Sequence, residues 1–405
     1  YHELIQKLNL AARPNFEKSL EKIIAIWEET KDSEDKYLNF AFLLADKFLF
    51  YSELEKEFSE DYHKQNSKDD LQNTNERIFE ELYAENYNTC FANPDYAVEI
   101  FGNELGEILQ AYYTDIRSLT RLSITHKIFG FEFYAKNFIE VYELLKAKSS
   151  DADSYKSKIN EIYKNFNKDW ITVAILERYA LDASAFSKLV ETADLTDIRY
   201  LYQYGMNITA NEIKTAKFLM EYPKEKVLEL AKSMVKAYIR GFELAKKDLT
   251  KKKTVSIIYN VGQEIIVREL IKEFAANKLQ VILNSAVSTS ANKQFDYDHR
   301  FDNSLYFDEQ YINKMLETQT IVLEELKDIV KLYSGPIYFD KFGEASFNPK
   351  QKESCLKLSD EQQKLKQHFG IEMNKLFQKY NPRTETSFSI IGFPVPEIGE
   401  QFSEI

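Results

Sequence analysis

Apolar residues in the first 248 positions recur at the spacing of amphipathic helices. Phe16, Leu20, Ile23 and Trp27, for example, fall on one helical face. The same periodicity returns over residues 37–54, 124–148, 155–165, 170–181, 195–204 and 224–247. The polar stretch 55–75 interrupts it, and we interpret that stretch as a loop or a solvated helix end. The pattern therefore predicts an all-helical domain over residues 1–248.

One predicted helix starts at Asn93-Pro94. Asparagine accepts hydrogen bonds from the free amides of a helix start, and proline is tolerated at the first helical position. We expect this helix to continue through Gly102 and Gly106 to Ile116. Because the two glycines lie one turn apart, a neighbouring helix could approach closely at that point.

Two capping boxes predict further helix starts. Thr209 with Glu212 opens one helix, and Ser359 with Gln362 opens another that reaches about residue 380. In each pair the hydroxyl and the longer polar side chain satisfy amides that the first helical turn leaves free.

After residue 248 the chain alternates between short apolar, β-branched runs and helical segments. The runs are TVSIIYN, QVILNSAV, GPIYFD and SFSIIGFP, separated by helices at 263–277, 308–332 and 359–380. Such alternation predicts right-handed crossovers and a mostly parallel sheet covered on both faces. Residues 249–405 are thus expected to form a Rossmann-like α/β domain with about four strands. Its first turn, NVGQEI, has one glycine where a dinucleotide fingerprint needs three.

Composition narrows the class of protein. The net charge of -12 disfavours general nucleic-acid binding, which needs a surplus of lysine and arginine. No apolar run approaches the ~20 residues of a membrane-spanning helix. Cys90 and Cys355 are too few for a disulfide framework, which favours a reducing compartment, and we expect a cytoplasmic protein with no membrane partner. The 26 Tyr and 29 Phe suit a large buried interface and a large helical core equally well.

Motifs of known catalytic sites are missing from the sequence. The five histidines include no pair at i, i+4 and no HExxH, so the usual zinc signatures are absent. There is no GxSxG turn and no P-loop, and neither cysteine has a histidine near it in sequence. We therefore predict that the chain contains no complete catalytic site of its own.

The tract DYDHRFDN concentrates charged side chains. The spacing of Asp296, Asp298 and Asp302 is similar to that of the carboxylates in a calcium-binding loop. However, the loop glycine and the closing glutamate are missing, and Arg300 would repel a cation. A hydrogen-bonded loop in which Arg300 bridges the carboxylates is the favoured interpretation. A ligand-facing loop at the edge of the sheet is the alternative.

Two Asp-Ile-Arg tripeptides lie in apolar surroundings. We interpret Asp115 with Arg117, and Asp197 with Arg199, as structural ion pairs that tie helices together.

The last residues, PVPEIGEQFSEI, place Ile398, Phe402 and Ile405 at helical spacing. We expect a helix to begin here with its apolar face barely started, so that the α/β domain is truncated and the chain is a piece of a longer protein.

Five tracts together resemble one protein family. They are FANPDYAVEIFGNELGEIL, ADLTDIRYLYQYG, KKDLTKKKTVSIIYNVGQE, NKQFDYDHRFDNSLYFDEQ and FSIIGFPVPEIGEQFSEI. The resemblance is to the bacterial leucyl aminopeptidases of the aminopeptidase T type, in the long Firmicutes form that carries a helical extension. It spans the chain from about residue 80 onward.

The resemblance implies a parent protein that removes N-terminal residues from short peptides. In that family two divalent metal ions, expected here as zinc, cobalt or manganese, activate the attacking water. Their ligands belong to a C-terminal domain beyond the stretch where this sequence ends, so none is assigned to a position in this chain. A homodimer is also implied, with the two domains of the parent enclosing a cavity.

The expected role of this chain is thus the N-terminal, non-catalytic portion that shapes the substrate chamber. Asp298, His299, Arg300 and Glu397 are the residues predicted to face the substrate. Two other functions stay open: a non-enzymatic scaffold or interaction protein, and a small-ligand-binding α/β module that uses the crevice at the strand ends.

Overall fold

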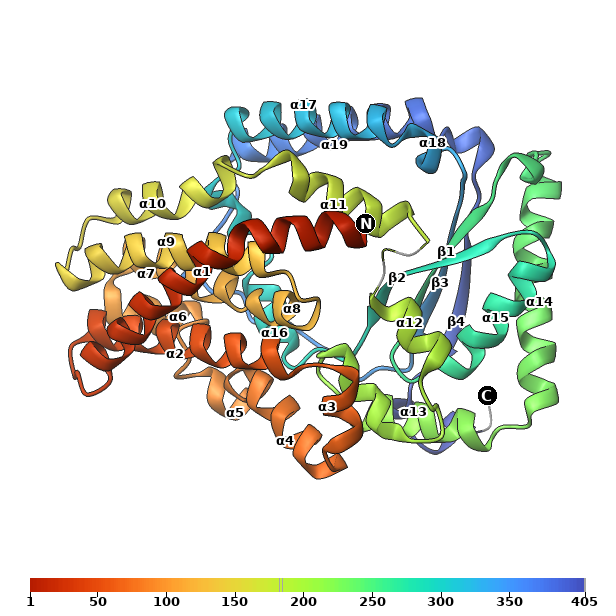
Figure 1. Cartoon of the computed structure of the whole chain (residues 1–405), viewed down its shortest axis with the longest axis horizontal. Helices are drawn as coiled ribbons and strands as arrows, with labels where there is room; N and C mark the ends of the chain where they lie inside the picture. The colour runs from red at the N-terminus through yellow and green to blue at the C-terminus, as the bar shows by residue number, and fades with distance from the viewer. Residues whose placement is uncertain (182, 184, 404–405) are drawn as a thin grey trace.

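The computed structural model describes residues 1–181, 183 and 185–403 (Figure 1). The first part contains helices α1 (His2–Thr30), α2 (Lys36–Glu57), α3 (Glu60–Gln65), α4 (Lys68–Phe79), α5 (Ala84–Tyr87), α6 (Pro94–Phe101), α7 (Asn103–Ile116), α8 (Leu119–Ile124), α9 (Ile128–Lys146), α10 (Ala152–Lys164), α11 (Lys168–Tyr179), α12 (Ala185–Thr192), α13 (Ala210–Glu221) and α14 (Lys224–Leu244). The second part contains β1 (Thr254–Asn260), α15 (Glu264–Ala276), β2 (Gln280–Val287), α16 (Lys293–Asp298), α17 (Glu309–Glu325), α18 (Lys327–Val330), β3 (Tyr333–Phe342), α19 (Asp360–Tyr380) and β4 (Ser389–Pro394). The chain thus combines helical and α/β structure, which agrees with the fold class predicted from the sequence.

The helices of the first 165 residues enclose one core, which we call the helical core. Helix α1 packs along α9 and α2, as the pattern of apolar residues on its face predicts. Phe48 of α2 stacks on Phe138 of α9 with ring centroids 5.2 Å apart, and both side chains are completely buried. Much of the aromatic content of the chain is used to fill this core.

The polar stretch 55–75, predicted as a loop or a solvated helix end, contains the end of α2, all of α3 and the first part of α4, which corrects the prediction of a loop. Ser59 caps α3 and Ser67 caps α4, the latter in a capping box with Asp70. Buried Asn75 of α4 donates to the carbonyl of Met206 at 2.7 Å. Because serines and aspartates favour both turns and helix caps, periodicity alone could not separate the two.

The helix predicted from Asn93 to Ile116 is two helices. Asn93 caps α6 as expected, but Gly102 adopts φ +86° and ends it. Helix α7 then folds back, so that a Cβ on Gly106 would lie 2.6 Å from the backbone of Val98. The predicted close helix approach is thus confirmed at Gly106, with α6 as the neighbour, but not at Gly102, where a Cβ would meet no atom within 4 Å.

The sheet has four parallel strands in the order β2-β1-β3-β4. The four apolar runs coincide with the four strands, and both predicted capping boxes, at Thr209 and Ser359, are present. Val255, Ile257 and Tyr259 of β1 point toward one face and are fully buried under α14 and α15.

The predicted domain boundary at residue 248 lies shortly before the first strand, but it does not separate two hydrophobic cores. Apolar residues 189–242, from α12, α13, α14 and the 3-10 helix Ile198–Tyr204, share one core with the sheet, which we call the sheet core. Helix α14 packs against α15 and contacts β4 (Figure 1). Since a parallel sheet must be covered by helices, the chain supplies one of them before its first strand.

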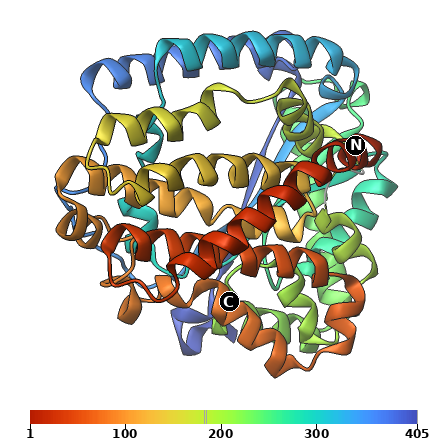
Figure 2. The same cartoon turned by 60° about the vertical axis from the view of Figure 1, so that its left-hand side comes forward.

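A third, small cluster joins α11 to helices α17 and α19, which lie side by side in both views (Figures 1 and 2). The two helices run in the same direction: Gln362 at the start of α19 donates to the carbonyl of Phe307 before α17, and Tyr380 at its end donates to Glu324 at the end of α17. The segment predicted as one helix over 308–332 is divided into α17 and α18.

The helix expected after β4 does not form. Residues Pro396–Ile398 and Glu400–Ser403 are short 3-10 turns separated by Gly399 at φ +93°. Phe402 packs on Phe218 of α13, and Ile405 lies outside the described residues. Within the described part of the chain, no helix is long and apolar enough to cross a membrane.

Candidate functional site

The carboxyl edge of the sheet is the first place to look for a site, because parallel sheets bind ligands there. The turn after β1 contains Gly262 at φ +99°, followed by the N-terminus of α15. The side chain of Glu264 lies at that N-terminus. Both of its carboxylate oxygens accept from the Gly262 amide at 3.0 Å, and one accepts from the Tyr200 hydroxyl at 2.6 Å.

Glu264 is completely buried, and this burial raises the pKa of its carboxyl group. In dinucleotide-binding folds a pyrophosphate occupies the corresponding position. Here the carboxylate of the chain itself is bound there, in keeping with the single glycine of the NVGQEI turn.

A second polar cluster connects the ends of β2 and β4. Glu212 of α13 accepts from both the amide and the hydroxyl of Thr289 at 2.7 Å. Glu397, after β4, accepts from Asn211 at 2.6 Å and from the Ala345 amide at 2.7 Å. These contacts lower the pKa of Glu397, the Ala345 hydrogen bond contributing most. Glu397 therefore lies at the carboxyl edge as an ionised, hydrogen-bonded side chain.

Asp298 and His299 lie away from this cluster, against the helical core. Asp298 is completely buried and forms an ion pair with Lys352 at 2.7 Å. His299 contacts Asp302 through Nδ1 at 2.7 Å and the carbonyl of Ala92 through Nε2 at 2.6 Å. These contacts join α16 to the segment before α6, which is the geometry of a structural network.

Arg300 does not bridge the carboxylates of its tract, contrary to the sequence-based interpretation. It is exposed, donates to the carbonyl of Tyr297, and lies over the Tyr297 ring at 3.7 Å. Lys352, 54 residues after Asp298, contacts this carboxylate instead, donating to Asp298 and to Asn93 at 2.7 Å each. The substrate-facing role of Asp298, His299, Arg300 and Glu397 stays a prediction, and the structure does not bring these four side chains into one cavity.

Between the two cores lies a cavity of about 600 Å³, which we call the carboxyl-edge cavity. One wall comes from the helical core and includes Arg121 and Ile124 of α8. The other follows β2 and includes Ser288, Thr289 and Asp296. This cavity could not be predicted from the sequence, because these two walls come from segments more than 150 residues apart and no local pattern connects them.

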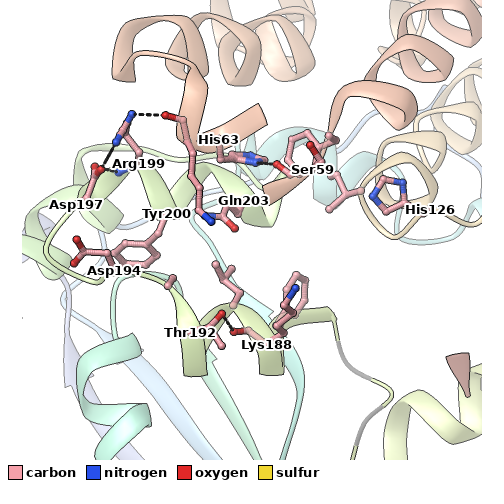
Figure 3. Close-up of a pocket in the computed structure, with 16 residues that line it drawn as sticks. Ser59, His63, His126, Lys188, Thr192, Asp194, Asp197, Arg199, Tyr200 and Gln203 are labelled. Carbon is pink, nitrogen blue, oxygen red and sulfur yellow. Dashed lines mark hydrogen bonds and ion pairs between the residues drawn. The ribbon is translucent and has the colours of Figure 1, made fainter. Parts of the chain in front are cut away.

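A second pocket, of about 490 Å³, opens between α3 and α12 (Figure 3). Arg199 and Asp197 lie on one side and His126 on the other, with Gln203 between them. Ile124 and Phe186 line both this pocket and the carboxyl-edge cavity, so the two hollows adjoin along the seam between the cores.

Charged groups in the α3–α12 pocket have defined partners. Asp197 pairs with Arg199 at 2.6 Å, which confirms one predicted ion pair. Arg199 also donates to the carbonyl of Asn66, tying α3 to the sheet core. Burial lowers the pKa of His63, whereas the hydrogen bond with Glu55 raises the pKa of His126.

The other predicted pair, Asp115 with Arg117, does not form. Arg117 pairs with Glu81, and Asp115 accepts from the hydroxyls of Tyr163 and Tyr134. Residues two positions apart in a helix lie on nearly opposite faces, so the side chains of Asp115 and Arg117 point away from each other. Burial raises the pKa of Asp115 to about 6.

The raised pKa of Asp115 predicts a pH-dependent stability. The folded state holds the proton more tightly than the unfolded chain, so this contribution is full below pH 3.8 and is lost as pH rises through about 6. Asp115→Asn keeps an acceptor for the tyrosines and removes the charge. We expect it to raise Tm by about 2–5 °C at pH 7.5 and to change Tm little at pH 4. Calorimetry of exposed Asp340→Asn is the control, and an equal gain at both pH values would contradict the assignment.

In the described part of the chain, no three His, Cys, Asp or Glu side chains are grouped so that they could hold a metal ion. The two divalent ions expected for the parent protein stay a prediction. Both cysteines are buried free thiols.

Comparison with known proteins yields no relative: no family model, no curated protein and no solved structure matches this chain.

Proposed function

We propose that this chain is the N-terminal, non-catalytic portion of a metal-dependent aminopeptidase, in which it shapes the chamber for short peptides. The observation that carries the proposal is the resemblance of the five tracts to that family. It is supported in the structure by contacts that join four of the tracts in two pairs. The carbonyl of Ala92 in the first tract accepts from His299 in the fourth, and Tyr200 in the second donates to Glu264 in the third.

The α/β region is, in this proposal, a Rossmann-like unit. The order β2-β1-β3-β4 equals the first four positions of the doubly wound order 2-1-3-4-5, in which a ligand crevice lies between strands 1 and 3. The carboxyl edge forms one wall of the chamber, and the helical core restricts entry to short peptides. The parent is proposed to be a cytoplasmic homodimer.

The test compares this chain with the longer parent protein. Hydrolysis of leucine p-nitroanilide and of a set of dipeptides is measured with added zinc, cobalt or manganese. We expect metal-dependent activity of the parent and none of this chain. Activity of this chain by itself would contradict a non-catalytic role, and an inactive parent would contradict the aminopeptidase assignment.

A variant of the parent tests the predicted substrate-facing residues. Glu397→Gln and Arg300→Ala are expected to change kcat/KM for dipeptides at least severalfold, whereas exposed Glu353→Ala should leave it unchanged. Unaltered kcat/KM in both variants would remove these residues from the chamber.

The second candidate is a small-ligand-binding module. The carboxyl-edge cavity favours it, because its volume lies within the range of small-molecule sites and it lies between two cores, where such sites concentrate.

A further inference from the structure

The carboxyl-edge cavity contains charges of both signs that the protein does not pair. Arg121 lines it from α8, and Asp296 lines it from α16. Both residues are exposed, and within the described part of the chain neither side chain forms a hydrogen bond or an ion pair. The guanidinium of Arg121 interacts with the phenol of Tyr1 only through its charge.

This arrangement differs from that of the other charged clusters. Arg117, one turn before Arg121, is neutralised by Glu81, and Asp298, two residues after Asp296, is neutralised by Lys352. Arg117 and Asp298 are buried, and Arg117 also lines the cavity but has its charge neutralised there, whereas Arg121 and Asp296 line the cavity without a partner. An unpaired cation and an unpaired anion on the same cavity are complementary to a ligand that carries both charges.

The rest of the lining is suited to a ligand with an uncharged body. Phe79, Phe186 and Phe295 supply apolar surface, and Ser288 and Thr289 supply hydroxyl groups at the end of β2. The hydroxyl oxygen of Thr120, also in the lining, is buried without a hydrogen-bond partner in the described structure. A buried polar atom without a partner costs free energy, so a bound polar group would satisfy it.

We propose that the carboxyl-edge cavity binds the zwitterion of an α-amino acid or short unblocked peptide with an apolar side chain. Arg121 binds the carboxylate, Asp296 binds the ammonium group, and the phenylalanine side chains contact the apolar side chain. The cavity of about 600 Å³ accommodates either ligand. The inference does not require the proposed function, since binding is measured on this chain without any hydrolysis.

Isothermal titration calorimetry of the chain with four probes tests the assignment. The probes are leucine, Leu-Leu, leucinamide, which lacks the carboxylate, and N-acetyl-leucine, which lacks the ammonium group. We expect leucine or Leu-Leu to bind, and the two blocked compounds to bind at least tenfold more weakly, the size of one lost charge-assisted contact. Tighter binding of leucine identifies a free amino acid as the ligand, and tighter binding of Leu-Leu identifies a peptide.

Two variants assign each charge to its partner group. In Arg121→Gln the preference for leucine over leucinamide should disappear, and in Asp296→Asn the preference for leucine over N-acetyl-leucine should disappear. Arg240→Gln and Asp328→Asn, on exposed helix surfaces, are the matched controls and should keep both preferences. Because Arg121 and Asp296 are exposed and unpaired, both variants should retain the wild-type Tm.

Absence of binding by all four probes at millimolar concentration would overturn the proposal. So would binding whose preferences are the same in both variants as in the wild type, because the charges would then have no part in recognition.

Discussion

Glu81→Ala is expected to lower the free energy of unfolding by about 3–5 kcal/mol, the cost of removing one partner from a buried charge cluster. Glu81 accepts from Lys47 at 2.6 Å through both oxygens, from Tyr113 at 2.7 Å, and from Arg117. The side chains of Lys47 and Arg117 are only 14% and 8% exposed. Without Glu81 two cations remain buried side by side, which is why the loss is large.

The pH dependence of this variant provides a second readout. Lys47 and Arg117 lower the pKa of Glu81 from 4.5 to about 2 despite its burial. A depressed carboxyl pKa gives stability that is present above pH 4.5 and is lost as pH falls through about 2. The difference between wild type and Glu81→Ala should therefore shrink between pH 4.5 and pH 2. Urea unfolding at several pH values measures it, with exposed Glu85→Ala expected to cost less than about 0.5 kcal/mol. A constant difference across this range would show that Glu81 contributes by packing alone.

The second large effect is expected for Asp298→Ala, again about 3–5 kcal/mol. Asp298 accepts from Tyr87 at 2.9 Å and Gln294 at 2.7 Å, and it neutralises Lys352, whose side chain is 5% exposed. Truncation leaves the Lys352 ammonium buried, with Asn93 as its remaining hydrogen-bond acceptor. The hydrogen bond that joins Tyr87 of the helical core to α16 is lost at the same time.

A double-mutant cycle separates this structural role from a role in substrate binding. Lys352→Met in the Asp298→Asn background removes both charges, so the double variant should be more stable than the sum of the two single losses by about 1–3 kcal/mol. Glu353→Ala, 96% exposed in the same segment, is the control. Additive losses would mean that the two side chains are not coupled in the folded protein.

Local patterns were sufficient for the strands and for several helix ends. The four apolar runs became four parallel strands, and Asn93, Thr209 and Ser359 cap helices as expected. These features depend on hydrogen bonds and burial within a few residues, which a sequence window contains. The break at Gly102 was missed because a positive φ is one of two options for glycine, and packing of α7 on α6 selects it.

The partners of charged residues, in contrast, could not be predicted from local patterns. Lys251, Lys252 and Lys253 form one basic run in sequence, yet Lys252 is 2% exposed and donates to Asn381, Glu385 and the carbonyl of Lys331. Arg300 was the expected bridge of its tract, and Lys352 is the bridge that forms. Which cation reaches a carboxylate depends on the path of the whole chain, so spacing in sequence does not predict it.

By itself, the sequence determined the four strands, many of the helices, the parallel sheet and the absence of a dinucleotide fingerprint, because each is set by side chains adjacent along the chain. Only the tertiary structure decided that α12 to α14 belong to the sheet core and that a cavity lies between the cores. It also decided which charges are neutralised and which, like Arg121 and Asp296, line that cavity unpaired. The physical reason is that burial and ion pairing are long-range properties: they depend on which surfaces exclude water from one another after the chain has folded.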